Sequence, residues 1–433
     1  AALGEGADAP ASAADADLRP PGPRAIAEAA ARVRAAASAS LAPHCFAAAL
    51  KATLALWRER GFERRSRAIG RIAAHTGFSL PLLEESLDAL MSPFTDSALD
   101  SLAAAIGDGA TRRSVAPVIA FVMAGNVTGA GMHEVVAALV GGAGAVLKSA
   151  SGEPVFWAEF ARTIRDIDAE VGARVAVFNW PRAAVESTAA LRANCDLLVA
   201  YGDDATVASF ARHPRVIAFG SRVSGAAISE SVSALPDMDG IADALARDVT
   251  LFEQLGCLSP HHVFVQEPSH GSRAGTARDF AARLAAALDH LAVRLPPPAK
   301  LPLNDAASVL HAREIARWRR IGGESVDLFE GGRLGWTVIC DAAAGFTVSP
   351  GFRTVCVSAF RDDADFRARV APAAGRLEAF AVAGSADERA RLGEILHEFG
   401  VTYLAAPGEM QSPPLTWRHG GGAFLDLLTG TPR

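Results

Sequence analysis

The order of apolar and polar residues divides the chain into a helical first part and a longer part in which strands and helices alternate. Between residues 23 and 110, apolar residues recur every three or four positions among Ala, Leu, Arg and Glu, and no run has the character of a strand. This spacing is that of amphipathic helices. We therefore predict a helical N-terminal region over residues 23–110. Residues 1–22, rich in Ala, Asp, Pro and Gly, are predicted to be a flexible tail.

Short apolar runs then alternate with stretches of helical character. The runs are residues 115–123, 143–147, 174–179, 196–201 and 215–219, and the helical stretches are residues 153–171, 183–193 and 203–213. Such alternation is typical of βαβ units in a parallel sheet that helices cover on both faces. We assign residues 111–255 to a dinucleotide-binding domain, in which ligands are expected beyond the carboxyl ends of the strands.

A second α/β pattern follows a predicted helix over residues 238–255. It comprises strands at residues 262–266, 336–340 and 354–360 and helices at residues 271–291 and 304–320. We assign residues 256–400 to a second α/β domain with the catalytic residues. Residues 401–433 are predicted to be a C-terminal segment that packs back on the first domain. The predicted fold class is therefore α/β, with a helical N-terminal region.

Composition and charge exclude several kinds of function. Half of the 433 residues are hydrophobic and 21% are charged, which permits a large core. The net charge of −6 provides no basic field for a nucleic acid. The most apolar stretch, residues 130–147, contains His133, Glu134 and four glycines, too many interruptions for a membrane span.

The cysteines are scattered and odd in number. Their positions are Cys45, Cys195, Cys257, Cys340 and Cys356, without a C-x-x-C pair. This pattern predicts neither a disulfide framework nor a zinc site, and we predict no metal site. The N-terminus also lacks the basic start and apolar run of a secretory signal. We therefore expect a reducing, cytoplasmic location.

Cys257 has the sequence context of a nucleophile. It stands between Gly256 and Leu258-Ser259-Pro260, where a helix is predicted to end at the boundary between the two domains. Glycine allows a ligand to approach the backbone, proline stops the helix, and a thiolate is a strong nucleophile. From these residues alone, a small cysteine buried in the core remains the commoner alternative.

The string LFEQLGCLSP at residues 251–260 resembles the nucleophile segment of the fatty acyl-CoA reductases of bacterial luminescence systems. That family is a divergent branch of the aldehyde dehydrogenase superfamily. Residues 124–127, the strand ending in Lys148, and residues 346–353 and 413–421 show further likenesses in the same order. The resemblance covers residue 115 to the C-terminus. It implies an aldehyde dehydrogenase-like fold with a parallel-sheet cofactor domain, a second α/β catalytic domain and Cys257 as the nucleophile.

The resemblance also implies an oxyanion hole. Its donors would be the side chain of Asn126 and the backbone N–H of Cys257. Preset donors of this kind stabilise charge that develops in the transition state, and the loss of one costs roughly 3 kcal/mol. Without the resemblance, Asn126 would be interpreted as a residue that turns or caps a loop.

The cofactor is expected along the strand that ends in Lys148. The resemblance places Lys148 near the adenosine ribose of a nicotinamide cofactor, and we predict contacts from Ser149 and Ser151 as well. Relatives that prefer NAD often carry a glutamate at the position of Ser151, and a serine does not repel a 2′-phosphate. We therefore predict NADPH, with NAD(H) as the alternative, because Glu153 is also placed to bind the ribose.

Two glycines are predicted to let the backbone approach the cofactor. Gly125 lies in the first loop after a strand, and Gly202 follows the strand at residues 196–201. The G-x-G of Gly129 and Gly131 is weak as a dinucleotide fingerprint, because Glu134 stands where its third glycine belongs.

Residues 219–225 contain no carboxylate, whereas hydrolytic aldehyde dehydrogenases carry a glutamate there as the base for water. The resemblance thus implies NADPH-dependent reduction of an acyl-CoA, of the fatty acyl class, to the aldehyde through an acyl-cysteine. The alternatives are reduction of an acyl phosphate or of a carrier-protein thioester, or a non-catalytic acyl-holding subunit. An acyl carrier protein or an acyl-activating enzyme is a candidate partner, and relatives suggest a homo-oligomer.

Four other titratable side chains are given structural roles. Glu253 is predicted to be a solvated or capping residue, and His133 is predicted to pack a helix. His261 and His262 should point to opposite sides of a strand, so that they would not share a metal.

Overall fold

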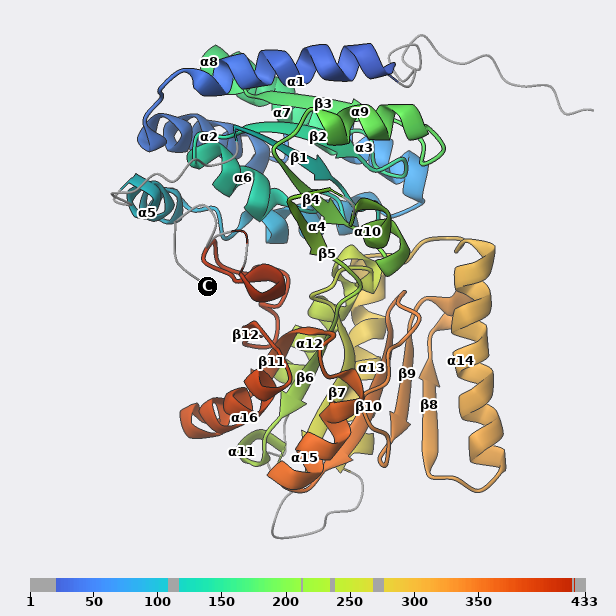
Figure 1. The fold of residues 1–433 in the computed structure, drawn as a ribbon. Helices are drawn as coiled ribbons and strands as arrows, with labels where there is room; N and C mark the ends of the chain where they lie inside the picture. The colour runs from blue at the N-terminus through green and yellow to red at the C-terminus, as the bar shows by residue number, and fades with distance from the viewer. Residues whose placement is uncertain are drawn as a thin grey trace, which may run out of the picture.

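The computed structural model describes residues 21–107, 117–211, 213–233, 238–267, 276–422 and 424. In these ranges the chain forms two α/β parts, each built on its own sheet (Figure 1). Nearly all of the predicted tail lies outside the described residues, as do the ends of the predicted segments at residues 108–110 and 425–433. None of the described helices combines the length and the apolar character that crossing a membrane requires.

The predicted helical N-terminal region is confirmed. It consists of α1 (Pro23–Ser38), α2 (Pro43–Arg58), α3 (Glu63–Thr76), α4 (Leu80–Met91) and α5 (Asp96–Gly107). In α2, Phe46, Leu50, Leu54 and Trp57 are buried on one face at helical spacing. The Trp57 indole N–H also donates to the Thr163 hydroxyl at 3.1 Å, which ties α2 to the helices beside the first sheet.

The first sheet is entirely parallel, with the strand order β3-β2-β1-β4-β5. Its strands are β1 (Val118–Val122), β2 (Gly144–Ser149), β3 (Val175–Asn179), β4 (Leu197–Tyr201) and β5 (Val216–Phe219). Its helices are α6 (Met132–Val140), α7 (Phe156–Ile167), α8 (Ala169–Gly172), α9 (Val185–Ala193) and α10 (Asp204–Phe210). Because the strand order reverses at β1, the loops after β1 and β4 diverge and open a crevice at the carboxyl ends.

The second sheet has seven strands in the order β12-β11-β6-β7-β10-β9-β8, and only β8 runs antiparallel. Its strands are β6 (Val223–Ile228), β7 (Pro260–Gln266), β8 (Val326–Glu330), β9 (Thr337–Asp341), β10 (Thr354–Phe360), β11 (Leu377–Ala383) and β12 (Tyr403–Ala405). The helices of this part are α11 (Glu230–Ser233), α12 (Asp239–Thr250), α13 (Thr276–Arg294), α14 (Leu303–Ile321), α15 (Asp363–Val370) and α16 (Ala386–Glu398). The two sheets together confirm the predicted α/β fold class.

The chain passes from one sheet to the other between β5 and β6 (Figure 1). This point lies earlier than the predicted boundary after Leu255. Strand β6 pairs with β7 and with β11, which comes much later in the chain, and α12 packs against α13. A local apolar run shows that a strand is buried, but it does not show which distant strand will pair with it.

The helix predicted over residues 238–255 is shorter than expected, because α12 ends at Thr250. Phe252, Glu253 and Gln254 then take left-handed backbone angles, with φ of 56°, 53° and 60°. Outside glycine, this conformation costs roughly 1–2 kcal/mol per residue. We call residues 252–254 the left-handed turn.

Contacts with the start of β10, with Arg353 just before it and with the start of β7 hold the left-handed turn in place. Arg353 donates to both carboxylate oxygens of Glu253, at 2.9 and 2.5 Å, and both side chains are buried. The Gln254 amide donates to the carbonyls of Pro260 and Thr354 at 2.7 Å, and its oxygen accepts from the Thr354 N–H. The prediction of a solvated or capping Glu253 is therefore wrong. Burial raises the pKa of Glu253, and the Arg353 charge opposes that effect.

We expect Arg353→Met to destabilise the protein by about 3–5 kcal/mol, because it leaves the buried Glu253 carboxylate without its partner. Urea unfolding followed by circular dichroism would measure the loss. Arg376→Met is the matched control, since Arg376 is exposed and surface changes stay within about 0.5 kcal/mol. Equal stability of the two variants would contradict the role assigned to the pair.

Candidate active site

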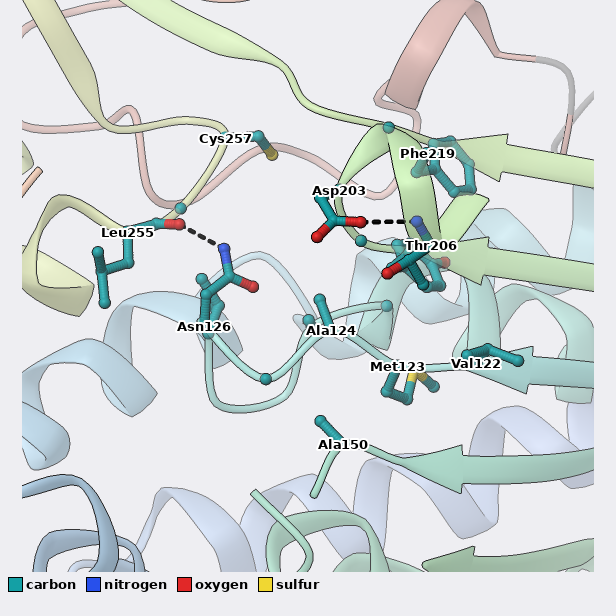
Figure 2. A pocket seen from close by; sticks show the side chains of 18 of the residues that line it. Val122, Met123, Ala124, Asn126, Ala150, Asp203, Thr206, Phe219, Leu255 and Cys257 are labelled. Atoms are coloured by element: carbon teal, nitrogen blue, oxygen red, sulfur yellow. Dashed lines mark hydrogen bonds between the residues drawn. The ribbon is translucent and has the colours of Figure 1, made fainter. Parts of the chain in front are cut away.

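A cavity of about 910 Å³ lies where the carboxyl ends of the first sheet face the left-handed turn. Its walls come from the loops after β1, β2, β4 and β5, from residues 254–258, and from C-terminal positions between residues 411 and 419. Figure 2 shows Cys257 and Asn126 on one side of this space and residues that follow β1 and β2 on another. The site therefore draws on both α/β parts of the chain.

Cys257 is the only one of the five cysteines, all of which are described, that lines the cavity. It is half-buried, and its carbonyl accepts a hydrogen bond of 2.7 Å from the Ser224 hydroxyl on β6. Burial raises the pKa of the Cys195, Cys340 and Cys356 thiols to about 12, with smaller contributions from neighbouring charges. These three thiols are therefore poor nucleophiles near neutral pH.

Asn126 lies in the loop between β1 and α6, beside the segment that carries Cys257. Its side-chain amide donates to the Leu255 carbonyl, two residues before Cys257 (Figure 2). Since an asparagine amide has two N–H groups, one remains for another acceptor. Gly125 is needed for the close approach of this loop to the next, because a Cβ there would come within 2.9 Å of the Ala150 Cβ.

Lys148, Ser151 and Gly202 line the same cavity. The Lys148 ammonium is half-buried and, among the residues that the structure describes, has no hydrogen-bond or ion-pair partner. Burial alone lowers its pKa. The Ser151 hydroxyl donates to the Trp180 carbonyl at 3.4 Å, and Gly202 has a φ of 154° that side chains rarely adopt.

Ser149 and Glu153, which the sequence predicted as possible cofactor contacts, do not line the cavity. Ser149 is fully buried, and its hydroxyl donates to the Phe178 carbonyl of β3 at 3.1 Å. Glu153 caps the start of α7, where its carboxylate accepts from the N–H groups of Val155 and Phe156 at 3.0 and 2.7 Å. Alternate side chains of a strand point to opposite faces, so that Lys148 and Ser149 do not face the same ligand.

The structure adds a buried acid–histidine pair that the sequence analysis missed. The Glu134 carboxylate of α6 accepts from Nδ1 of His419 at 2.8 Å, and both side chains line the cavity. Cys257 lines the same cavity, and its interaction with His419, like that of Glu134, raises the pKa of His419. A signal for His419 was present, since it lies within the C-terminal likeness at residues 413–421. Nothing local to either residue indicated their pairing.

The neighbouring histidines have structural contacts. His133 Nε2 hydrogen-bonds to the Pro413 carbonyl at 2.9 Å, and its ring packs on Phe94 and Trp417. His261 interacts with Ser349 and His262 with Ser358, on opposite faces of β7. Among the described residues, no group of three His, Cys, Asp or Glu side chains is arranged to hold a metal.

The carboxylates that line the described cavity, Glu134 and Asp203, both have partners. Glu134 bonds to His419, and Asp203 caps α10 by accepting from the Thr206 N–H at 2.6 Å (Figure 2). The hydrogen bonds from Thr206 lower the pKa of Asp203, and the nearby Arg182 charge lowers it further. The described cavity therefore presents no free carboxylate to the thiol.

Comparison with known proteins places these features in a family. A family model described as acyl-CoA reductase (LuxC) matches residues 46–430, and no curated protein matches significantly. An aldehyde dehydrogenase from Bacillus cereus, solved with NAD+, has 16% identity and a TM-score of 0.64, over 90% of this chain and 82% of that one. An NAD-dependent benzaldehyde dehydrogenase from Corynebacterium glutamicum has 16% identity and a TM-score of 0.66, over 89% of this chain and 85% of that one.

At such low identity, the solved structures establish the fold alone, which is that of the aldehyde dehydrogenases. The family match covers most of the chain and identifies an aldehyde-forming oxidoreductase. The resemblance found in the sequence is thereby confirmed: the chain belongs to the acyl-CoA reductase (LuxC) family.

Proposed function

We propose that the protein reduces a fatty acyl thioester of coenzyme A to the aldehyde, with NADPH, through an acyl-Cys257 intermediate. The observation that carries this proposal is the position of Cys257. It is the one cysteine in the cavity between the carboxyl ends of the parallel sheet and the left-handed turn. The family match supports reduction of an acyl group.

The first chemical step belongs to Cys257. Its thiolate attacks the thioester carbonyl, and negative charge develops on the carbonyl oxygen. The Cys257 N–H and the second N–H of Asn126 are the donors proposed for this oxyanion. Their preset dipoles favour the transition state over the ground state, since the charge is present only there.

The same site is suited to keeping the acyl group on the enzyme until it is reduced. A carboxylate base of the kind that activates water in hydrolytic aldehyde dehydrogenases would have to be free, and the described carboxylates of the cavity are already engaged by His419 and by the start of α10. This arrangement supports a reductase over a hydrolytic aldehyde dehydrogenase. The bound nicotinamide would supply the hydride that converts the acyl group to the aldehyde.

The residues around Lys148 fit an anionic cofactor. A half-buried ammonium without a partner among the described residues favours a negatively charged ligand in the cavity. Arg182, which the sequence analysis did not consider, lines the same cavity, and Ser151 adds no negative charge. Glu153, the competing candidate for the ribose, is occupied as the cap of α7. We therefore propose NADPH, with Lys148 and Arg182 near its 2′-phosphate and with NADH as the alternative.

Other acyl donors would use the same nucleophile. An acyl phosphate or an acyl carrier protein thioester presents the same carbonyl to Cys257, and a non-catalytic acyl-holding subunit would stop after the transfer. Lys148, which has no partner among the described residues, favours a cofactor-using enzyme over the acyl-holding subunit. Association into a homo-oligomer remains a prediction from relatives.

We expect wild-type protein to oxidise NADPH with acyl-CoAs of suitable length and to release aldehyde and CoA, and Cys257→Ala to show no oxidation above background. The measurement follows NADPH absorbance over a panel from acetyl- to tetradecanoyl-CoA, with an acyl phosphate in parallel. Cys45→Ala is the matched control, since Cys45 lies outside the cavity. Full activity in Cys257→Ala would exclude the acyl-cysteine, and acylation without oxidation would favour the acyl-holding subunit.

We expect Lys148→Ala and Arg182→Ala each to lower kcat/KM for NADPH by about 10- to 100-fold, because a charged hydrogen bond contributes roughly 1.5–3 kcal/mol. The values for NADH should change much less, since NADH lacks the 2′-phosphate. Lys300→Ala, at an exposed lysine, is the control. An equal loss with both cofactors would place these side chains elsewhere on the dinucleotide.

A further inference from the structure

The C-terminal segment brings a histidine to the nucleophile. His419 and Cys257 line the same cavity and interact electrostatically, and the His419 Nδ1 donates to Glu134 at 2.8 Å. Because Nδ1 is used by Glu134, Nε2 is the ring nitrogen left to face the thiol. Cys257, His419 and Glu134 thus stand in the order nucleophile, base and orienting carboxylate.

The imidazole is fixed from both α/β parts. Its ring stacks on Phe219 with 4.0 Å between centroids and on Trp417 with 4.2 Å. The next residue, Gly420, donates its N–H to the Glu378 carboxylate of β11 at 3.1 Å, and a Cβ at Gly420 would come within 3.0 Å of Phe219. The ring is therefore held in one orientation before any substrate arrives.

The charges around His419 favour its protonated form. The titratable groups that face it are Glu134 and His133 of α6, Tyr201 of β4 and Cys257. Burial opposes a charge on His419, but Glu134 and Cys257 outweigh this and raise its pKa. Burial likewise opposes ionisation of Glu134, but His419 outweighs this and lowers the pKa of Glu134. A His419 imidazolium beside the Glu134 carboxylate is therefore the favoured state of this pair.

We propose that His419, positioned by Glu134, is a catalytic acid and base: it takes the proton of the Cys257 thiol and later gives it to the departing sulfur of coenzyme A. In the resting enzyme the proton moves from Sγ to Nε2 and leaves a thiolate–imidazolium pair. The Sγ lone pair then forms the new C–S bond, and the carbonyl π pair moves to oxygen. When that pair returns, the C–S bond to coenzyme A breaks, and the Nε2 proton goes to the leaving thiolate.

This inference rests on the proposed function for the identity of the nucleophile, but it concerns a half-reaction that needs no nicotinamide. Acyl-CoA and the Cys257 thiol give acyl-Cys257 and free CoA, so that atoms and charge balance without a reductant. Glu134 does not touch the substrate and is a positioning residue. A failure of His419 to act can therefore be distinguished from a failure of the protein to be acylated.

The test measures two reactions of Cys257 without nicotinamide. The first is alkylation by iodoacetamide between pH 5 and 9, quantified at Cys257 by peptide mass spectrometry. The second is CoA release and acylation of Cys257 after rapid mixing with decanoyl-CoA. The proteins compared are wild type, His419→Gln, Glu134→Gln and the control His311→Gln, in which the replaced histidine is exposed on α14.

We expect wild-type Cys257 to be alkylated well below pH 7, because the imidazolium stabilises the thiolate. In His419→Gln, alkylation at pH 6.5 should be at least tenfold slower than in wild type and should recover at high pH. Acylation by decanoyl-CoA should fall about 10²- to 10⁴-fold, the usual contribution of acid–base catalysis. Glu134→Gln should shift both profiles in the same direction by a smaller amount, and His311→Gln should match wild type.

Wild-type alkylation that follows a simple thiol titration near pH 8.5, the ordinary value for a cysteine, would overturn the proposal whether or not any variant folds. Equal profiles for wild type and a folded His419→Gln would also overturn it. If decanoyl-CoA and the other chain lengths leave wild-type Cys257 unacylated while its alkylation depends on His419, the proposed function fails and the acid–base pair stands. A general packing defect would lower both rates at every pH without moving the profile.

Discussion

Phe252, Glu253 and Gln254 adopt a left-handed backbone that side chains disfavour, and the candidate site depends on what keeps them there. The Glu253 carboxylate is buried against Arg353, and the Gln254 amide bonds to the backbone at Pro260 and Thr354. The Phe252 N–H donates to the Ser86 hydroxyl of α4 at 3.1 Å. These contacts come from a helix of the N-terminal region and from the second sheet, so that the turn forms only when both are in place.

The position of Cys257 follows from this constraint. Three residues after the turn, the thiol reaches the cavity at the carboxyl ends of the first sheet, where the diverging loops of a parallel sheet leave room for a ligand. Asn126 then joins the two parts directly through its bond to the Leu255 carbonyl. A rigid approach to Cys257 suits the proposed reaction, in which the oxyanion donors must stand in place before charge appears.

The charged side chains discussed for the cavity form two groups, an acid–histidine pair near Cys257 and two cationic side chains toward β2. On the side of the cavity that holds Cys257, the Glu134 carboxylate is held by His419. Toward β2, Lys148 has no partner among the described residues, and Arg182 lies at the same cavity. The proposed acid–base chemistry thus involves residues near Cys257, and the proposed binding of an anionic dinucleotide involves Lys148 and Arg182.

The amino-acid sequence by itself determined the elements and the class of the fold. Apolar runs set the strands of the first sheet within a few residues, since burial on both faces of a parallel strand leaves a local pattern. The glycine and proline around Cys257, together with the family resemblance, singled out that cysteine among five. The same resemblance, together with the apolar run before it, singled out Lys148 at the end of a strand.

Only the tertiary structure decided which distant residues meet. Glu253 pairs with Arg353, and Glu134 with His419, across 100 and 285 positions of the chain. The side-chain period of β2 turned Ser149 away from the cavity, and the pairing of β6 with β11 moved the change of sheets ahead of Leu255. Local patterns record burial, whereas the energy of a buried charge pair or a strand pairing depends on a partner that the fold alone brings near.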